Sequence, residues 1–183
     1  QVIAIEKDVR FRPLLEELAQ AAPTLSLVFG DALQANEAAL AERRPAHLIS
    51  NLPYNVGTPL LIKWLTGPWT PRSLTLMFQR EVADRITAPV GDDAYGRLSV
   101  IVQATCKTQR VLDAPARAFT PPPKVDSAVV RLEPRADRPE PRRLDALQAI
   151  TAAAFGQRRK MLRASLKALG GEALAVEAGL DPQ

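Results

Sequence analysis

The stretch Leu48-Ile49-Ser50-Asn51-Leu52-Pro53-Tyr54 is a short apolar strand that runs directly into a polar and aromatic turn. Two further apolar segments, Val2–Ile5 and Leu25–Phe29, precede it and read as buried strands, and apolar residues at helical spacing follow each of them. Alternating strands and helices are typical of a parallel sheet with helices on both faces. The sequence therefore predicts an α/β, Rossmann-like fold with this turn at the carboxyl edge of the sheet.

The remaining elements extend this pattern and then change it. Further strands are expected at Leu74–Phe78, Val111–Leu112 and Ser127–Leu132. Helices are expected around residues 14–18, 38–43, 60–65, 81–85 and 98–104, although the nearly continuous apolar residues of 98–104 fit a strand about equally well. Residues 134–143, rich in proline and arginine, have the composition of a linker. We therefore divide the chain into a domain over 1–133, a linker over 134–143 and a small helical domain over 144–183.

The bulk composition limits the possible classes of protein. With 183 residues the chain can form one domain with a sizeable core and a small appendage, and no apolar run approaches the ~20 residues of a membrane span. The net charge of +4 permits an anionic partner without requiring one. A single cysteine, Cys106, and a single histidine, His47, exclude an internal disulfide and a Cys/His zinc cluster. A soluble protein of a reducing compartment is expected.

Polar side chains close three of the predicted strands. Glu6 follows the first strand, Asp31 the second and Asn51 the third. Ligands of open α/β sheets bind at the carboxyl ends of strands, where an acidic residue can accept the hydroxyl groups of a ribose. We assign that role to Glu6, which also fits a solvated loop carboxylate, while Asp31 after Gly30 also fits a turn former. Together the three residues predict a ligand with a ribose and a base.

The tetrapeptide Asn51-Leu52-Pro53-Tyr54 combines two carbonyl acceptors and an aromatic ring in one turn. The side-chain carbonyl of Asn51 and a main-chain carbonyl, taken as that of Leu52, can each accept one N–H of a planar amine and draw its nitrogen toward tetrahedral geometry. Pro53 stiffens the turn, and a base can stack on Tyr54. Such a site suits methylation of the exocyclic amine of adenine. The same residues also fit a strand-ending turn with a buried tyrosine.

Seven stretches distributed over nearly the whole chain match one known family. They are Val2–Glu6, Gly30–Ala32, Asn51–Asn55, Gln79–Val82, Tyr95–Val100, Ala118–Leu132 and Phe155–Lys160. With these stretches the chain resembles the ribosomal RNA adenine N6-dimethyltransferases, which modify two adjacent adenines near the 3′ end of small-subunit rRNA. DNA adenine methyltransferases share related versions of the tetrapeptide, so the stretch from Phe119 to Leu132 is the more specific match.

The resemblance implies S-adenosylmethionine as the cofactor. Glu6 would meet its ribose, Asp31 with the adjoining Ala32 its adenine, and Asn51 with Leu52 its methyl-donor end and the target amine. Tyr54 and Phe119 would be the two aromatic faces around a flipped target base. Without the family, Phe119 before three prolines also fits a hydrophobic plug at the end of a loop.

The fold implied by the resemblance is the methyltransferase variant of the doubly wound sheet, with seven strands of which the last is antiparallel, followed by a small helical domain. The family's first strand and Gly-rich loop precede the matching residues, so the chain reads as N-terminally truncated. It is expected to lack part of the sheet centre and one wall of the cofactor pocket.

The implied partner is small-subunit rRNA within a pre-assembled ribosomal subunit, and a cytoplasmic monomer with a role in ribosome biogenesis is expected. Two alternatives stay open. One is a large-subunit rRNA adenine methyltransferase of the macrolide-resistance type, and the other is a non-catalytic RNA-binding factor of ribosome assembly on the same scaffold.

Basic residues near the C-terminus form a candidate RNA-binding surface. We expect a helix after Gln157 in which leucines occupy one face and cations spaced by four line up on another. The candidate phosphate-binding residues are Arg158, Arg159, Lys160, Arg163 and Lys167. The same pattern also fits the solvated face of an amphipathic helix.

Overall fold

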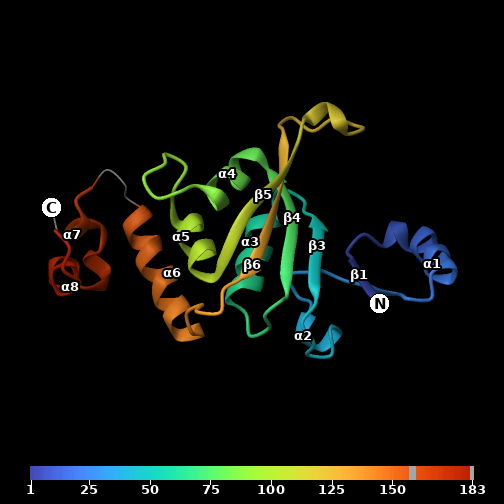
Figure 1. The fold of residues 1–183 in the computed structure, drawn as a ribbon, viewed down its shortest axis with the longest axis horizontal. Coiled ribbons are helices and arrows are strands. Elements are labelled where there is room, and N and C mark those ends of the chain that lie inside the picture. Colours follow the sequence, from blue (N-terminus) through green and yellow to red (C-terminus); the bar gives the residue numbers. More distant parts are fainter. Residues whose placement is uncertain (157–159, 182–183) are drawn as a thin grey trace.

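The computed structural model describes residues 1–156 and 160–181, in which strands and helices alternate as expected (Figure 1). The strands are β1 (Val2–Glu6), β2 (Leu25–Phe29), β3 (His47–Asn51), β4 (Ser73–Gln79), β5 (Cys106–Ala114) and β6 (Ser127–Pro134). The α-helices are α1 (Arg12–Ala21), α2 (Glu37–Leu40), α3 (Gly57–Thr66), α4 (Arg80–Thr87), α5 (Arg97–Thr105), α6 (Pro141–Gly156), α7 (Leu162–Ser165) and α8 (Gly171–Glu177). Short 3-10 turns lie at Val9–Phe11, Ala116–Ala118 and Lys167–Leu169.

The described residues form two sheets. One has the strand order β3-β4-β6-β5, with β3 parallel to β4 and β6 antiparallel to both of its neighbours, and the other is the parallel pair β1-β2. The expectation that the last strand is antiparallel is confirmed. The described residues do not form the single seven-stranded sheet of the family, because none of their strands bridges the β1-β2 pair and β3 with backbone hydrogen bonds. This gap agrees with the expectation that part of the sheet centre is missing.

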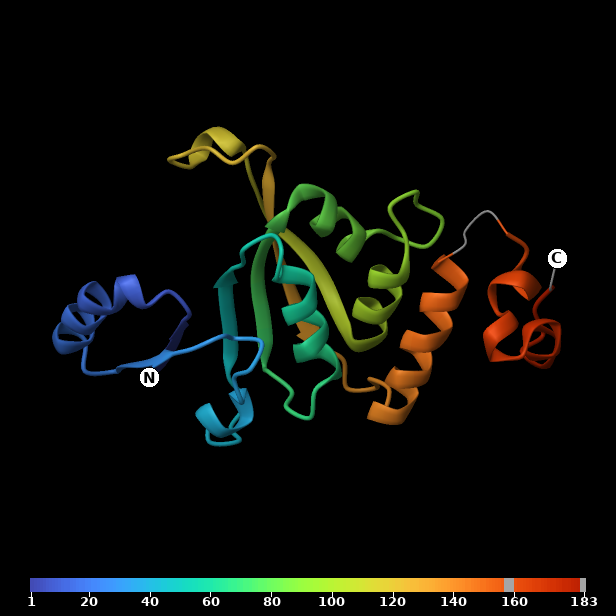
Figure 2. The same ribbon diagram turned by 180° about the vertical axis from the view of Figure 1, so that it is seen from behind.

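Helices cover only one face of the four-stranded sheet. Figures 1 and 2 show α3, α4 and α5 on the same side, and burial along β4 alternates accordingly. Leu74, Leu76 and Phe78 point to the helices and are buried, whereas Thr75 and Met77 face the other way and are half-buried. The expected helices on both faces are therefore not found over this sheet in the described part of the chain.

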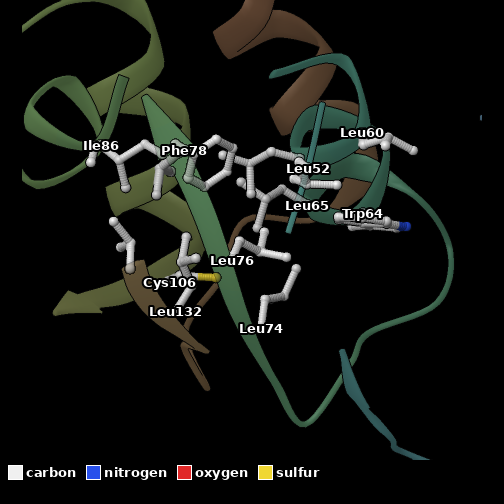
Figure 3. Close-up of a cluster of buried hydrophobic side chains, with 14 of the residues drawn as sticks. Leu52, Leu60, Trp64, Leu65, Leu74, Leu76, Phe78, Ile86, Cys106 and Leu132 are labelled. Atoms are coloured by element: carbon white, nitrogen blue, oxygen red, sulfur yellow. The ribbon is translucent and has the colours of Figure 1, made fainter. Parts of the chain in front are cut away.

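The hydrophobic core lies between this sheet face and the helices (Figure 3). Side chains from β4 and β6 meet those of α3 and α4 in one cluster, which also includes Leu52 of the turn after β3. The alternation of β6, with Ala128, Val130 and Leu132 buried and Arg131 exposed, matches that of β4 across the antiparallel ladder. The core thus anchors the predicted functional turn through the buried side chain of Leu52.

Helix α3 shows why the local sequence selects its structure. Leu60, Leu61, Trp64 and Leu65 recur at helical spacing, and all four are buried as predicted. The helix ends at Gly67, where a Cβ atom would lie 2.7 Å from the carbonyl oxygen of Lys63. Only glycine allows the chain to turn away so close to the last helical carbonyls.

The first lobe, which comprises β1, α1 and β2, is less buried than its composition suggests. Its strands have the predicted bounds, but none of their residues is buried, and Leu14 and Leu18 on α1 are 64% and 53% exposed. The guanidinium of Arg12 lies 3.8 Å from the ring centre of Phe29 and ties α1 to β2. The expectation of buried strands is wrong here. Among the described residues this two-stranded sheet packs mainly against α1, and one helix leaves its strands half-buried.

Two other element boundaries differ from the predictions. The helix expected over 38–43 is the shorter α2, because Glu42 and Arg43 have positive φ, which a right-handed helix does not allow. The strand expected at Val111–Leu112 extends over all of β5, since it pairs along the length of β6. The segment 98–104 is the helix α5, as preferred.

The segment predicted as a linker, 134–143, contains the last residue of β6 and the first residues of α6. Arg138 within it donates hydrogen bonds to Thr70 Oγ1 at 2.7 Å and to the Leu65 carbonyl at 3.0 Å. Helix α6 then packs against α5 and α3. The division into two domains stays a prediction, and this segment is held to the core at Arg138.

Candidate functional site

Glu6 and Asp31 lie side by side at the carboxyl ends of β1 and β2. The two strands are parallel with Glu6 opposite Phe29, and the Gly30 N–H donates to the Glu6 carbonyl at 2.9 Å. The Glu6 carboxylate accepts a hydrogen bond from the Asp8 N–H at 2.7 Å. The parallel pairing therefore brings together two acidic residues that are 25 positions apart in the sequence, as the strand-end pattern predicts.

Asp31 is held as a carboxylate by its neighbours. A hydrogen bond from Lys7 at 2.6 Å, followed by one from the Leu33 N–H at 2.9 Å, lowers the pKa of Asp31 below its ordinary value. The bond to Leu33, two residues onward, confirms that Asp31 forms a turn. An ionised carboxylate at this position can still accept a hydrogen bond from a ligand, so its second role stays a prediction.

Asn51 ends β3, and the tetrapeptide that begins with it forms a tight turn into α3. The Pro53 carbonyl accepts hydrogen bonds from the N–H groups of Val56 and Gly57, both at 3.1 Å, while Leu52 is buried in the core. A Cβ atom on Gly57 would lie 3.3 Å from the Phe78 ring, so this glycine lets the turn sit closely against β4. The turn is thus fixed from both sides, and Asn51 is exposed at its start.

Tyr54 is not the buried tyrosine that a purely structural, strand-ending turn would have. Its side chain is 41% exposed, and its hydroxyl shares a hydrogen bond of 3.0 Å with the hydroxyl of Ser127, the first residue of β6. One end of the ring is therefore anchored while part of its surface is open to solvent. An anchored, accessible ring is what stacking with a base requires.

Phe119 lies on an arm, residues 115–126, that connects β5 to β6 and projects beyond the sheet (Figure 1). It follows the 3-10 turn Ala116–Ala118, its N–H donates to the Ala116 carbonyl at 3.2 Å, and it is half-buried. The Tyr54–Ser127 bond places the base of this arm next to the tetrapeptide. Whether Phe119 is a second stacking face stays a prediction.

A cleft of about 860 Å³ opens beside the tetrapeptide between α3, α4, α5 and α6. Thr58 and Val82 line both this cleft and a small cavity against Leu52 and Tyr54, so the two are adjacent. Nothing in the sequence indicated the cleft, because its walls come from four helices that only the tertiary fold brings together.

The candidate RNA-binding residues are only partly within the described chain. Arg158 and Arg159 lie outside the described residues, and Lys160, Arg163 and Lys167 are exposed. The predicted continuous helix is wrong, because α7 ends at Ser165 and a 3-10 turn leads to Gly170 and Gly171, whose φ values are +119° and +58°. Because the α-helix ends between them and Lys167 lies in the 3-10 turn, Arg163 and Lys167 are not aligned by one α-helix.

Three further features limit what the described part of the chain can do. Cys106 is a buried free thiol, and its burial raises its pKa to about 11, so it stays protonated near neutral pH. Among residues 1–156 and 160–181 there is no group of three or more His, Cys, Asp or Glu side chains placed to hold a metal ion. None of the described helices has the length and apolar character needed to cross a membrane.

Lys63 on α3 holds the loop after Asp31 in place. Its role was not predicted from the sequence. Its ammonium group donates to the carbonyls of Ala32 and Ala35, both at 2.7 Å, and to Glu37 Oε1 at 2.8 Å. Trp64 Nε1 donates to the same Glu37 oxygen at 2.7 Å. A lone cation among the apolar residues of α3 was the available signal, and its partners could not be read from the sequence.

Replacing Lys63 with methionine should lower the free energy of unfolding by about 1–3 kcal/mol. The variant leaves two carbonyls and the Glu37 carboxylate without their shared donor, and such unsatisfied groups cost roughly that much. Urea unfolding gives the change, and hydrogen exchange of the amides in residues 31–37 should quicken. Lys107→Met, at an exposed position on β5, is the control. A loss of unfolding free energy as small as that of the control would contradict the role of Lys63 in holding this loop.

The α/β fold with its mixed sheet is that of the methyltransferase class, and the candidate residues lie at the carboxyl ends of its parallel strands. Two crystal structures share this fold over 100% of the chain. A dimethyladenosine transferase from Plasmodium falciparum matches with a TM-score of 0.78, 27% identity and 68% of its own chain covered. The 23S rRNA methyltransferase ErmE matches with a TM-score of 0.71, 27% identity and 74% of its own chain covered.

A family model described as "Ribosomal RNA adenine dimethylase" matches residues 1–179. The chain belongs to this family, which confirms the resemblance drawn from the sequence. The ribosomal RNA small subunit methyltransferase A of Phenylobacterium zucineum is 79% identical over 182 residues. That match covers 100% of this chain and 64% of the relative, so the chain spans about two thirds of the relative's length.

Proposed function

We propose that the gene product transfers methyl groups from S-adenosylmethionine to the N6 amines of two adjacent adenines near the 3′ end of small-subunit rRNA, with a role in ribosome biogenesis. The observation that carries the proposal is the turn after β3, where an exposed Asn51, a buried Leu52 and an anchored, accessible Tyr54 follow one another. Membership of the adenine dimethylase family and the high identity to a small-subunit enzyme support the same substrate.

The turn has the groups that activation of an adenine amine needs. The amine's lone pair is delocalised into the ring, so the nitrogen attacks poorly while it stays planar. The Asn51 side-chain oxygen and the Leu52 carbonyl accept its N–H groups and favour a tetrahedral nitrogen, while Pro53 keeps the two acceptors aimed. The base stacks on Tyr54, with Phe119 proposed as the second face. The rate advantage comes from positioning the amine in line with the methyl group.

The residues present suit the cofactor. S-adenosylmethionine supplies an electrophilic methyl group when bound. The Glu6 carboxylate would accept its ribose hydroxyls, and Asp31, whose pKa lies below the ordinary value, would accept a hydrogen bond from its adenine amine, with Ala32 beside it. Asn51 would contact its methyl-donor end. Two neighbouring carboxylate acceptors are an appropriate set for a nucleoside, and their strands place both at one edge.

The RNA would be held through its phosphates by the basic residues after α6. We propose Arg158, Arg159, Lys160, Arg163 and Lys167 as these contacts, and the part of the chain over 144–183 as the RNA-binding domain. The exposure of Lys160, Arg163 and Lys167 supports this role. We further propose that the substrate is a pre-assembled small subunit and that the enzyme acts as a cytoplasmic monomer.

A methylation assay on separated ribosomal subunits tests the proposal. Small subunits that lack dimethyladenosine should incorporate up to four methyl groups each from labelled S-adenosylmethionine, two on each of two adenines, and large subunits none. Incorporation into large subunits only would favour the second candidate, which the likeness to the 23S rRNA methyltransferase ErmE suggests. No incorporation into either subunit by the full-length gene product, with RNA binding intact, would favour a non-catalytic assembly factor.

A further inference from the structure

We propose that Asp126 and Ser127 are positioning residues that hold Tyr54 and the Phe119 arm in place around the target base. The proposal rests on the proposed function, because it assigns these two residues to the same site. Both lie in the stretch that matches the family, yet neither the sequence pattern nor the chemistry of the turn gave them a role.

Ser127 is a rigid anchor for the Tyr54 ring. It is 1% exposed, and its backbone lies in the β6 ladder opposite Gln79 of β4 and Ala114 of β5. Its hydroxyl meets the Tyr54 hydroxyl at 3.0 Å across a separation of 73 residues. A buried strand residue therefore anchors the hydroxyl end of a ring whose surface is partly open to solvent, and this limits where the ring can offer a face to a base.

Asp126 closes the arm that carries Phe119. Its Oδ1 atom accepts a hydrogen bond from the Ala116 N–H at 2.9 Å, and Ala116 in turn accepts one from the Phe119 N–H at 3.2 Å. Its Oδ2 atom pairs with Arg80 Nη1 at 3.2 Å, and its carbonyl accepts from the Arg80 N–H at 2.9 Å. The two ends of the arm are thereby joined to each other and to the start of α4.

The two residues are adjacent, so one short segment links the groups proposed around the base. Ser127 reaches back to the turn after β3, and Asp126 reaches forward along the arm. Loss of the Ser127 contact would free the Tyr54 ring, and loss of the Asp126 contact would free the arm that carries Phe119. Because small misplacements in a site that acts by positioning slow the reaction, we expect the loss to appear in kcat.

A double-mutant cycle between Tyr54 and Ser127 tests this inference in the full-length gene product. Tyr54→Phe and Ser127→Ala remove the same hydrogen bond from its two sides, and each should lower kcat on small subunits about 5- to 10-fold, the range of one neutral hydrogen bond. The KM for the subunit should change less than about 2-fold, because phosphate contacts dominate RNA affinity. The double variant should be no slower than either single variant.

Ser73→Ala is the matched control. Ser73 is a buried serine in β4 whose hydroxyl also contacts a ring, His47 Nδ1 at 2.7 Å, at the opposite end of the strand from the site. Its kcat should equal that of the wild type. Tyr54→Phe removes no buried atom from the sheet. If a melting experiment shows that Ser127→Ala does not fold, the kcat of Tyr54→Phe alone still tests the inference.

Asp126→Asn and Asp126→Ala test the arm in the same assay. Asparagine keeps an oxygen for the Ala116 N–H and should stay within about 2-fold of the wild-type kcat, whereas alanine should lose about 5- to 10-fold. Additive losses in the Tyr54–Ser127 cycle, or a wild-type kcat for Ser127→Ala and Asp126→Ala, would overturn the positioning role while methylation by the wild type stands. A wild type without methylation would overturn the proposed function and this inference with it.

Discussion

Replacing Asn51 with alanine should lower kcat for adenine methylation by about 100-fold or more, with RNA affinity unchanged. In the proposed reaction the side-chain oxygen is one of two acceptors for the target amine, and loss of one preorganised hydrogen-bonding group at a reacting centre costs about 10²–10³ in rate. RNA affinity is expected to come mainly from the proposed phosphate contacts of the basic residues after α6. Single-turnover methylation of small subunits and salt-controlled RNA binding measure the two effects separately.

The exposure of Asn51 makes this variant clean to interpret. The residue ends β3 and is not part of the core, so Asn51→Ala should melt within a few degrees of the wild type. Asn51→Asp is the informative companion, because it retains an acceptor oxygen and should recover part of the rate. An alanine variant within about 3-fold of the wild-type kcat would remove Asn51 from the reaction and, with it, the observation on which the proposed function rests.

Replacing Leu76 with alanine should lower the free energy of unfolding by about 2–5 kcal/mol, the usual cost of a buried leucine. Leu76 is fully buried at the centre of β4, where the sheet meets α3 and α4 (Figure 3). Removing its side chain leaves a cavity that the strand cannot close, since β3 and β6 hold it on both sides. Urea denaturation followed by circular dichroism gives the change.

Ile49→Ala is the matched control for this effect. Ile49 lies on the neighbouring strand, is just as apolar, and is 78% exposed. Its replacement should cost less than about 1 kcal/mol, because it buries little area and loses mainly strand propensity. Equal losses for the two variants would contradict the assignment of one helix-covered and one open face to the sheet.

Most elements of the fold followed from local patterns. The bounds of β2 and the buried face of α3 match their predictions, because period-two and helical spacing of apolar residues persist in those segments. The predictions failed where the local pattern did not constrain the outcome. The helix expected after Gln157 had the right spacing, yet α7 ends at Ser165 and a 3-10 turn follows it, and the helices expected on the second sheet face are not found among the described residues.

The candidate site was predictable in its members but not in their support. Glu6, Asp31 and Asn51 were visible as polar residues that close apolar strands. Lys63, Asp126 and Ser127 were not, since each acts through partners 10 or more positions away that become neighbours only in the folded chain. The separation of β1-β2 from the larger sheet, in contrast, agrees with the expectation from the sequence that part of the sheet centre is missing.

The family could be recognised from the sequence alone, and so could the groups that the turn Asn51-Leu52-Pro53-Tyr54 offers, because side-chain acceptors, a rigid proline and an aromatic ring are properties of the residues themselves. The tertiary structure decided that Tyr54 is accessible and anchored rather than buried, that one sheet face is open, and that a cleft adjoins the turn. These features depend on contacts between segments far apart in the chain, and no local pattern encodes them.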